Sequence, residues 1–134
     1  MKMLCLLLLA ALLVACVPPG LPGPAPTAQP GYLEGKVTIG PLSPVQKAGE
    51  TPPPPPPEVC TARSIDVSAA DGKTLVANVK VSAECTYRVA LAPGSYVVNI
   101  ARTGIDRGTG LPKTVTIAGG QTVQLDVDID TGIR

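Results

Sequence analysis

The chain contains no histidine, no tryptophan and no phenylalanine, and its only aromatic residues are three tyrosines. Without histidine it cannot build a Ser-His-Asp or Cys-His catalytic group, nor a zinc site with a histidine ligand. Its charge is nearly balanced, with 11 basic and 10 acidic residues. This balance excludes the strongly basic surface that a nucleic-acid-binding domain needs. We therefore expect no enzyme activity, no cofactor, no metal site and no nucleic-acid partner.

Residues 1–15 have the pattern of a secretory signal peptide. Met1 and Lys2 form a short positive head, and the apolar run MLCLLLLAALL follows at residues 3–13. A helix of this length spans about 17 Å, whereas the hydrocarbon core of a bilayer is about 30 Å thick. The run is therefore long enough for a signal peptide but too short for a transmembrane helix.

Residues 13–16 (LVAC) resemble the cleavage motif of bacterial lipoprotein leaders. In that family the cysteine thiol receives a diacylglyceryl group, and cleavage leaves the cysteine as the first residue. The resemblance therefore implies that Cys16 is lipidated and that the protein is anchored to a membrane without spanning it. Val17, in place of aspartate, resembles leaders that are sorted to the outer membrane in cells with two membranes. The alternative is an ordinary secretory leader with an incidental cysteine.

Residues 16–30 are expected to form a linker that begins at the lipidated cysteine. Residues 17–30 include six prolines and no charged residue. Such a segment cannot bury a core and has few backbone donors, so we expect it to be extended and solvated. In polyproline II form it spans about 43 Å. It is either a spacer of selected length or a flexible tether, and we favour the tether.

From residue 31 onward the chain alternates apolar and polar residues, which is typical of half-buried antiparallel strands. Seven such segments are bounded by turn residues, at residues 32–39, 61–69, 75–81, 87–91, 96–100, 115–117 and 123–129. The dipeptide Asp71-Gly72 predicts a two-residue hairpin between the second and third segments. We therefore expect residues 31–134 to form an all-β domain, a seven-stranded antiparallel sandwich of two sheets with Greek-key connections.

Residues 86–98 (TYRVALAPGSYVV) contain a tyrosine strand followed by the pattern Leu-x-Pro-Gly-x-Tyr. Together with residues 35–37 and 65–67, this run resembles the carboxypeptidase regulatory-like domains, over residues 31–129. The resemblance implies a prealbumin-like or immunoglobulin-like sandwich with a non-catalytic role in adhesion, carbohydrate contact or surface architecture. The chain departs from the family in two places. Residues 83–85 (AEC) replace the usual Asp-x-x-Gly, and a long insert occupies residues 41–59.

The insert contains six consecutive prolines at residues 52–57. In polyproline II form these residues make a stiff rod about 19 Å long. Such a rod either docks into an aromatic-lined groove on a partner or only stiffens the loop. We favour the stiff loop, because no flanking basic or aromatic residue adds specificity.

Cys60 and Cys85 are the two cysteines that remain available in the mature domain. Of the four cysteines in the chain, one lies in the leader and Cys16 is expected to carry lipid. Disulfides persist outside the cytoplasm. The predicted hairpin places Cys60 opposite Ala83, two residues from Cys85, which suits the Cα separation of about 5.5 Å that a disulfide needs. We therefore predict a Cys60–Cys85 disulfide, and the alternative is two free thiols.

Three short motifs suggest chemistry that the rest of the sequence does not support. Residues 130–132 (DTG) match the aspartic-protease triplet, but only two residues follow, too few to enclose a catalytic loop. The alternating aspartates of residues 126–130 lie about 6.8 Å apart, too far for one Ca²⁺ ion without other ligands. We interpret them as a solvated face that discourages edge pairing. Lys36 and Asn99 suggest an intramolecular isopeptide bond, but Lys36 is expected to face solvent.

These observations predict an extracytoplasmic, lipid-anchored β-sandwich with a non-catalytic structural or protein-interaction role at the cell envelope. The alternative is a binding module for a carbohydrate or small ligand, with the glycine-rich loop of residues 103–110 as its lip. That loop carries Asp106 and Arg107 but no aromatic platform for a sugar. An enzyme with a site that the sequence does not reveal is a third alternative. The expected partners are the membrane, through the anchor, and an envelope protein or glycan.

Overall fold

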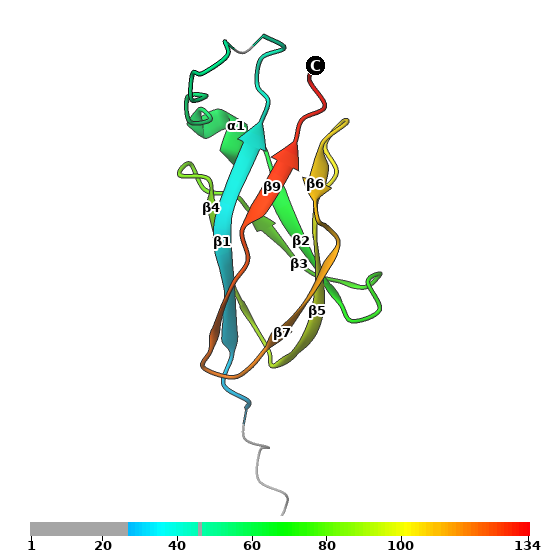
Figure 1. Cartoon of the computed structure of the whole chain (residues 1–134). Helices are drawn as coiled ribbons and strands as arrows, with labels where there is room; N and C mark the ends of the chain where they lie inside the picture. The colour runs from blue at the N-terminus through cyan, green and yellow to red at the C-terminus, as the bar shows by residue number, and fades with distance from the viewer. Residues whose placement is uncertain (1–26, 46) are drawn as a thin grey trace, which may run out of the picture.

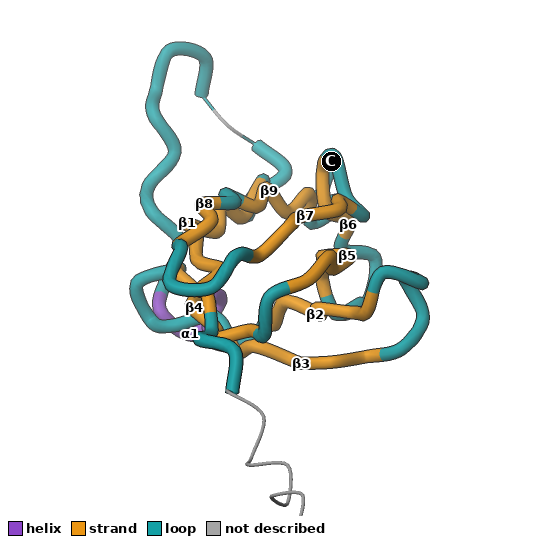
Figure 2. The backbone as a smooth tube through the Cα atoms, turned by 90° about the horizontal axis from the view of Figure 1, so that it is seen from below, coloured by secondary structure: helices purple, strands orange, loops and turns teal. Residues whose placement is uncertain are grey.

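The computed structural model describes residues 27–45 and 47–134. The predicted signal peptide at residues 1–15, the lipidation site Cys16 and most of the linker at residues 16–30 lie outside the described residues. The described part of the chain folds into two packed β-sheets and one short helix (Figures 1 and 2). None of its helices is long and apolar enough to cross a membrane.

The first sheet is built around a long strand that begins the domain. Its strands are β1 (Gly31–Gly40), β4 (Thr86–Leu91), β6 (Arg107–Thr109), β8 (Thr122–Gln124) and β9 (Val127–Asp130). They lie in the order β4-β1-β9-β6, and β8 pairs with β1 beside its first half. β1 is antiparallel to β4 but parallel to β8 and β9.

The second sheet contains four antiparallel strands in the order β3-β2-β5-β7. They are β2 (Ser64–Ala69), β3 (Leu75–Lys80), β5 (Gly94–Ile100) and β7 (Lys113–Ile117). The helix α1 (Pro57–Thr61) precedes β2 and lies near the end of the sandwich at which β1 ends (Figure 1).

The core lies between the two sheets, because alternate residues of each strand point inward. Branched aliphatic side chains suit this pleated surface and make up most of it. The most deeply buried side chains are Leu33, Val37, Ile65, Val67, Val98, Ile117, Val127 and Ile129.

Tyr87 makes a buried side-chain hydrogen bond in the core. Its hydroxyl donates a hydrogen bond of 2.7 Å to the backbone carbonyl of Leu125. Burial raises the pKa of Tyr87 to about 12, and the nearby Asp126 carboxylate adds to the shift. The chain passes so close to β1 at this point that a Cβ on Gly35 would overlap the Leu125 carbonyl, so only glycine fits there.

The predicted all-β sandwich of two sheets is confirmed, but the described residues form nine strands where the sequence predicts seven, and two strand pairs are parallel. The last predicted strand, residues 123–129, is divided into β8 and β9. The division falls at Asp126, whose Oδ1 accepts a 2.9 Å hydrogen bond from the backbone N–H of Lys36. A side chain thus replaces a backbone carbonyl in the ladder. The other additional strand is β6, which lies within residues 103–110, where the sequence predicts a loop.

The predicted start of the second strand, at residue 61, is wrong. Residues 57–61 form α1, with a proline in its first turn. Proline suits that position because its φ is already helical and the missing N–H would have no helical partner. The proline run therefore leads into a helix, and β2 begins three residues later than predicted, at Ser64.

The predicted two-residue hairpin at Asp71-Gly72 is a longer loop, residues 70–74. The Asp71 carboxylate accepts hydrogen bonds from two backbone N–H groups of this loop at 2.8 and 2.9 Å, which makes a local turn. The strand register pairs Ser64 with Lys80, one residue from the predicted register, but an irregularity between Val67 and Ser68 restores the predicted register at the Ser68–Leu75 pair. Leu75 begins the edge strand β3 and is 56% exposed.

Candidate functional site

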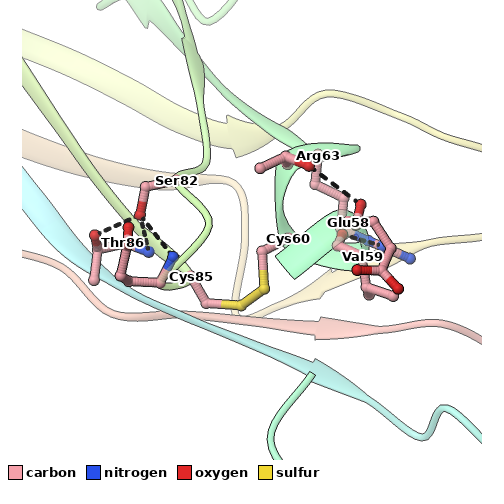
Figure 3. Close-up of a disulfide and its surroundings, with 9 residues drawn as sticks. Glu58, Val59, Cys60, Arg63, Ser82, Cys85 and Thr86 are labelled. Carbon is pink, nitrogen blue, oxygen red and sulfur yellow. Dashed lines mark hydrogen bonds between the residues drawn. A yellow bond between two sulfur atoms is a disulfide. The ribbon is translucent and has the colours of Figure 1, made fainter. Parts of the chain in front are cut away.

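Cys60 in α1 and Cys85 in the turn between β3 and β4 form a disulfide, with 5.1 Å between their Cα atoms (Figure 3). Both residues are buried. The predicted pairing is confirmed, but the geometry behind the prediction is wrong. Cys60 lies in a helix and not in a strand opposite Ala83, so the disulfide connects α1 to the β3–β4 turn.

Cys85 has a left-handed backbone conformation, with φ of +56°, and is the one non-glycine residue in the described ranges with a positive φ. This conformation favours glycine, because a Cβ crowds the following carbonyl. The turn thus holds a non-glycine residue in a conformation that glycine adopts more readily, and the side chain of that residue forms the disulfide.

The β3–β4 turn takes β4 away from β1 before β1 ends. The last β1–β4 pair is Lys36 with Thr86. One more backbone hydrogen bond follows, from the N–H of Val37 to the carbonyl of Cys85, at 2.7 Å. The N–H of Cys85 then donates to the Ser82 carbonyl at 3.0 Å, and Ser82 Oγ accepts the N–H of Thr86 at 3.2 Å (Figure 3). Beyond this point the described structure has β9 on one side of β1 and no strand on the other.

The segments that follow β1, residues 41–45 and 47–56, form a long loop beyond this bare strand edge (Figures 1 and 2). We call it the proline loop. It encloses a cavity of about 1090 Å³ together with the end of β1 and the turn at residues 83–85. We call this cavity the edge groove. Pro52 to Pro55 of the predicted proline rod line it, and so does Val45, which is 78% exposed.

The charged residues that line the edge groove balance one another. They are Lys36, Lys47, Glu50 and Glu84. Lys47 and Glu50 form an exposed ion pair of 3.8 Å. The groove thus combines apolar walls with no excess of either charge.

A buried ion pair that the sequence analysis missed supports α1. Arg63 Nε donates to Asp106 Oδ2 at 2.8 Å, and the two side chains are only 15% and 8% exposed. Arg63 Nη1 also donates to the carbonyl of Val59 in α1, at 2.7 Å (Figure 3). The pair holds the loop before β6 against the helix that carries Cys60. Asp106, considered as a ligand group of the loop at residues 103–110, therefore has a structural partner.

The aspartic-protease triplet, residues 130–132, holds the end of the chain against the start of the proline loop. The Thr131 hydroxyl donates a hydrogen bond to the carbonyl of Pro41. Hydrogen bonds from the Arg134 guanidinium, at 2.8 Å, and from the Gly132 N–H, at 2.9 Å, lower the pKa of Asp130 to about 2. The triplet is thus occupied by local structural contacts.

The other motifs considered for chemistry are not brought together. Lys36 is exposed in the first sheet, whereas Asn99 lies in β5 of the second sheet and pairs with Asp66 of β2. Hydrogen bonds from the Lys36 N–H and from Gln124 lower the pKa of Asp126. Among the described residues, no group of three or more His, Cys, Asp or Glu side chains is placed to hold a metal ion.

A smaller depression of about 480 Å³ lies over β1 and β4 and is lined by Glu34 and Arg88 among other polar residues. Its lining includes one aromatic residue, Tyr87, which is buried and presents no surface for stacking. Tyr32 lies next to Arg88 but does not line the depression. The Arg88 guanidinium lies 4.3 Å from the centre of the Tyr32 ring and also pairs with Glu34. Because the arginine covers one face of the ring, that face is not open for stacking on a sugar.

No protein-family model and no curated protein matches this chain. Among solved structures, it is similar to GBS52, the minor pilin of Streptococcus agalactiae, with 16% identity and a TM-score of 0.53 over 78% of this chain and 45% of the pilin. It is also similar to the Bacillus anthracis TIE protein, with 18% identity and a TM-score of 0.48 over 76% of this chain and 16% of that one. A DUF3823 family protein from Parabacteroides merdae has 15% identity and a TM-score of 0.46, over 76% and 46% of the two chains.

The likeness to the minor pilin supports the predicted β-sandwich fold and nothing finer. The chain spans less than half the length of each of these three proteins. Membership in the carboxypeptidase regulatory-like family therefore stays a prediction.

Proposed function

We propose that this chain is a lipid-anchored, extracytoplasmic β-sandwich that acts by non-catalytic contact with a partner at the cell envelope. The leader motif that ends at Cys16 supports the anchor. The Cys60–Cys85 disulfide supports an oxidising location outside the cytoplasm. The fold is shared with part of a minor pilin, which agrees with a role at the cell surface.

This proposal rests on the position of the linker and the proline loop at opposite ends of the sandwich. Residues 27–30 lead into the start of β1 at one end of the domain, and the proline loop leaves β1 at the other end (Figure 1). β1 has ten residues, which corresponds to a length of about 33 Å. Residues 27–30 thus enter the domain at the end opposite the edge groove. An anchor upstream of residue 27 is therefore joined to the end of the domain that lies away from the groove.

The non-catalytic part of the proposal is supported by how the ionisable side chains are used. Asp106 pairs with Arg63, Asp130 pairs with Arg134, and Asp126 accepts a backbone hydrogen bond within the first sheet. Each of these groups has a structural contact that explains it.

The anchor is tested by labelling with a fatty acid and by partition into detergent. Wild type and Cys5→Ser, which changes the leader cysteine outside the motif, are expected to take up labelled palmitate and to enter the detergent phase. Cys16→Ser is expected to do neither. Equal labelling and equal partition of all three proteins would contradict the proposal.

A further inference from the structure

The end of β1 directs backbone polar groups into the edge groove. Along β1 the N–H and C=O groups of even-numbered residues face β8 and β9, as shown by the hydrogen bonds of the Tyr32 N–H, 2.8 Å, and the Gly40 carbonyl, 3.1 Å. Those of odd-numbered residues face β4, as the 2.7 Å bond from Val37 to Cys85 shows. Ile39 is the next odd-numbered residue. Its N–H and C=O therefore point to where a continued β4 would lie.

No strand of the described ranges occupies that position. In a regular ladder the N–H of Cys85 would donate to the Val37 carbonyl, but it donates to Ser82 instead. The disulfide and the left-handed conformation of Cys85 hold the turn in this course. Both backbone groups of Ile39 are thus left without a partner strand, whereas the Val37 carbonyl is buried, because that residue is only 1% exposed. A strand edge without a partner is a template for pairing with another extended segment.

The proline loop does not supply the missing strand. Pro52 to Pro55 line the groove but have no backbone N–H, so they cannot donate hydrogen bonds to the edge. The same wall carries Leu42 and Val45, which are 39% and 78% exposed. The loop therefore offers apolar surface beside the edge while leaving the sheet open.

We propose that the edge groove binds an extended peptide segment of a partner protein, which joins the first sheet as a strand beside the end of β1. The peptide backbone supplies one acceptor to the Ile39 N–H and one donor to the Ile39 carbonyl. Its side chains on one face pack against Leu42 and Val45. The balanced charge of the groove fits a segment with little net charge. This inference rests on the proposed contact role but not on the lipid anchor.

Hydrogen exchange measured residue by residue tests the open edge in the purified full-length protein. The Ile39 amide is expected to exchange at least about tenfold faster than the Gly35 amide, which is paired with Tyr87 in the same strand. Equal protection of the two amides in the free protein at low concentration would overturn the proposal, because it would mean that the edge is already covered.

The binding test uses an acetylated hexapeptide of alternating valine and threonine with a fluorescent label. Because backbone groups make the contact, the peptide is expected to bind with saturation below about 1 mM and to slow exchange of the Ile39 amide about tenfold. Two further peptides carry N-methyl groups on the amides of one or the other face. Methylation of the face that pairs with β1 is expected to weaken binding at least about fivefold, and methylation of the other face is not.

Matched variants locate the binding surface. Val45→Asp, in the wall of the groove, is expected to weaken binding at least about fivefold, since it places a charge against the apolar face of the peptide. Leu75→Asp changes an exposed leucine of β3 in the other sheet and is expected to have no effect. Absence of saturable binding, equal binding of the two methylated peptides, or equal effects of the two variants would each overturn the proposal. Protection of the Ile39 amide that grows with protein concentration alone would also overturn it, in favour of a second copy of this chain.

Discussion

Removal of the Cys60–Cys85 disulfide should strongly destabilise the domain. The two cysteines are 25 residues apart. In the chain-entropy treatment, closing a loop of this length lowers the entropy of the unfolded chain enough to stabilise the folded state by about 3.5 kcal/mol. Replacing both cysteines by alanine should lower the free energy of unfolding by about this amount, and somewhat more because two buried side chains are shortened.

The backbone conformation of Cys85 allows a second test, which compares glycine with alanine at this position. With φ at +56°, a residue with a Cβ is disfavoured there by about 1–2 kcal/mol relative to glycine. Glycine returns part of this advantage because its unfolded state has more conformational freedom. The variant Cys60→Ala with Cys85→Gly should therefore be more stable than Cys60→Ala with Cys85→Ala by about 1 kcal/mol.

Urea unfolding followed by circular dichroism, without reducing agent, measures both differences. For a domain of this size the free energy of unfolding falls by about 1 kcal/mol per molar urea, so the first effect shifts the midpoint by about 3 M. A loss below about 1 kcal/mol in the double-alanine variant would refute the role given to the disulfide. Equal midpoints for the glycine and alanine variants would refute the role given to the left-handed turn.

Five further substitutions, which include two matched controls, test individual contacts by urea unfolding. Asp106→Asn should lower the free energy of unfolding by about 3 kcal/mol, because it leaves a buried arginine without its counter-charge; Glu34→Gln, which removes an exposed ion pair, should lower it by less than about 1 kcal/mol. Tyr87→Phe should lower it by about 1 kcal/mol at neutral pH. Since folding raises the pKa of Tyr87 from 10 to about 12, the wild type should lose stability as the pH rises through this window, and the variant should lose less. Gly35→Ala should destabilise by at least about 2 kcal/mol through overlap with a backbone carbonyl, whereas Gly40→Ala, with no atom within 4 Å of its Cβ, should have little effect. Similar losses within either matched pair, or parallel pH profiles for wild type and Tyr87→Phe, would contradict these assignments.

The alternation of apolar residues was enough to predict the two-sheet sandwich, because period-two burial is a local property of each strand. It could not predict the parallel pairing of β1 with β8 and β9, which depends on the path of the whole chain. It also predicted a single strand where Asp126 interrupts the ladder. A carboxylate that replaces a backbone carbonyl does not change the alternation of apolar and polar residues.

The disulfide could be predicted by elimination among four cysteines, even though the assumed hairpin was wrong. The edge groove could not. It depends on the residue at which β4 leaves β1, and that point is set by the left-handed Cys85. The one available signal was the replacement of the usual Asp-x-x-Gly of the resembled family by residues 83–85 (AEC), which pointed to an altered turn. The Arg63–Asp106 pair joins residues 43 apart with no linking motif, so no local pattern predicts it.

Intact mass spectrometry of the protein extracted from membranes tests the proposed anchored, extracytoplasmic state most directly. The expected mass is that of a chain that begins at Cys16, carries a diacylglyceryl group there and is lighter by two hydrogens because Cys60 and Cys85 are joined. Alkylation before reduction should add no label to these two residues. A chain that retains residues 1–15, an unmodified Cys16, or two thiols that alkylate without reduction would contradict it.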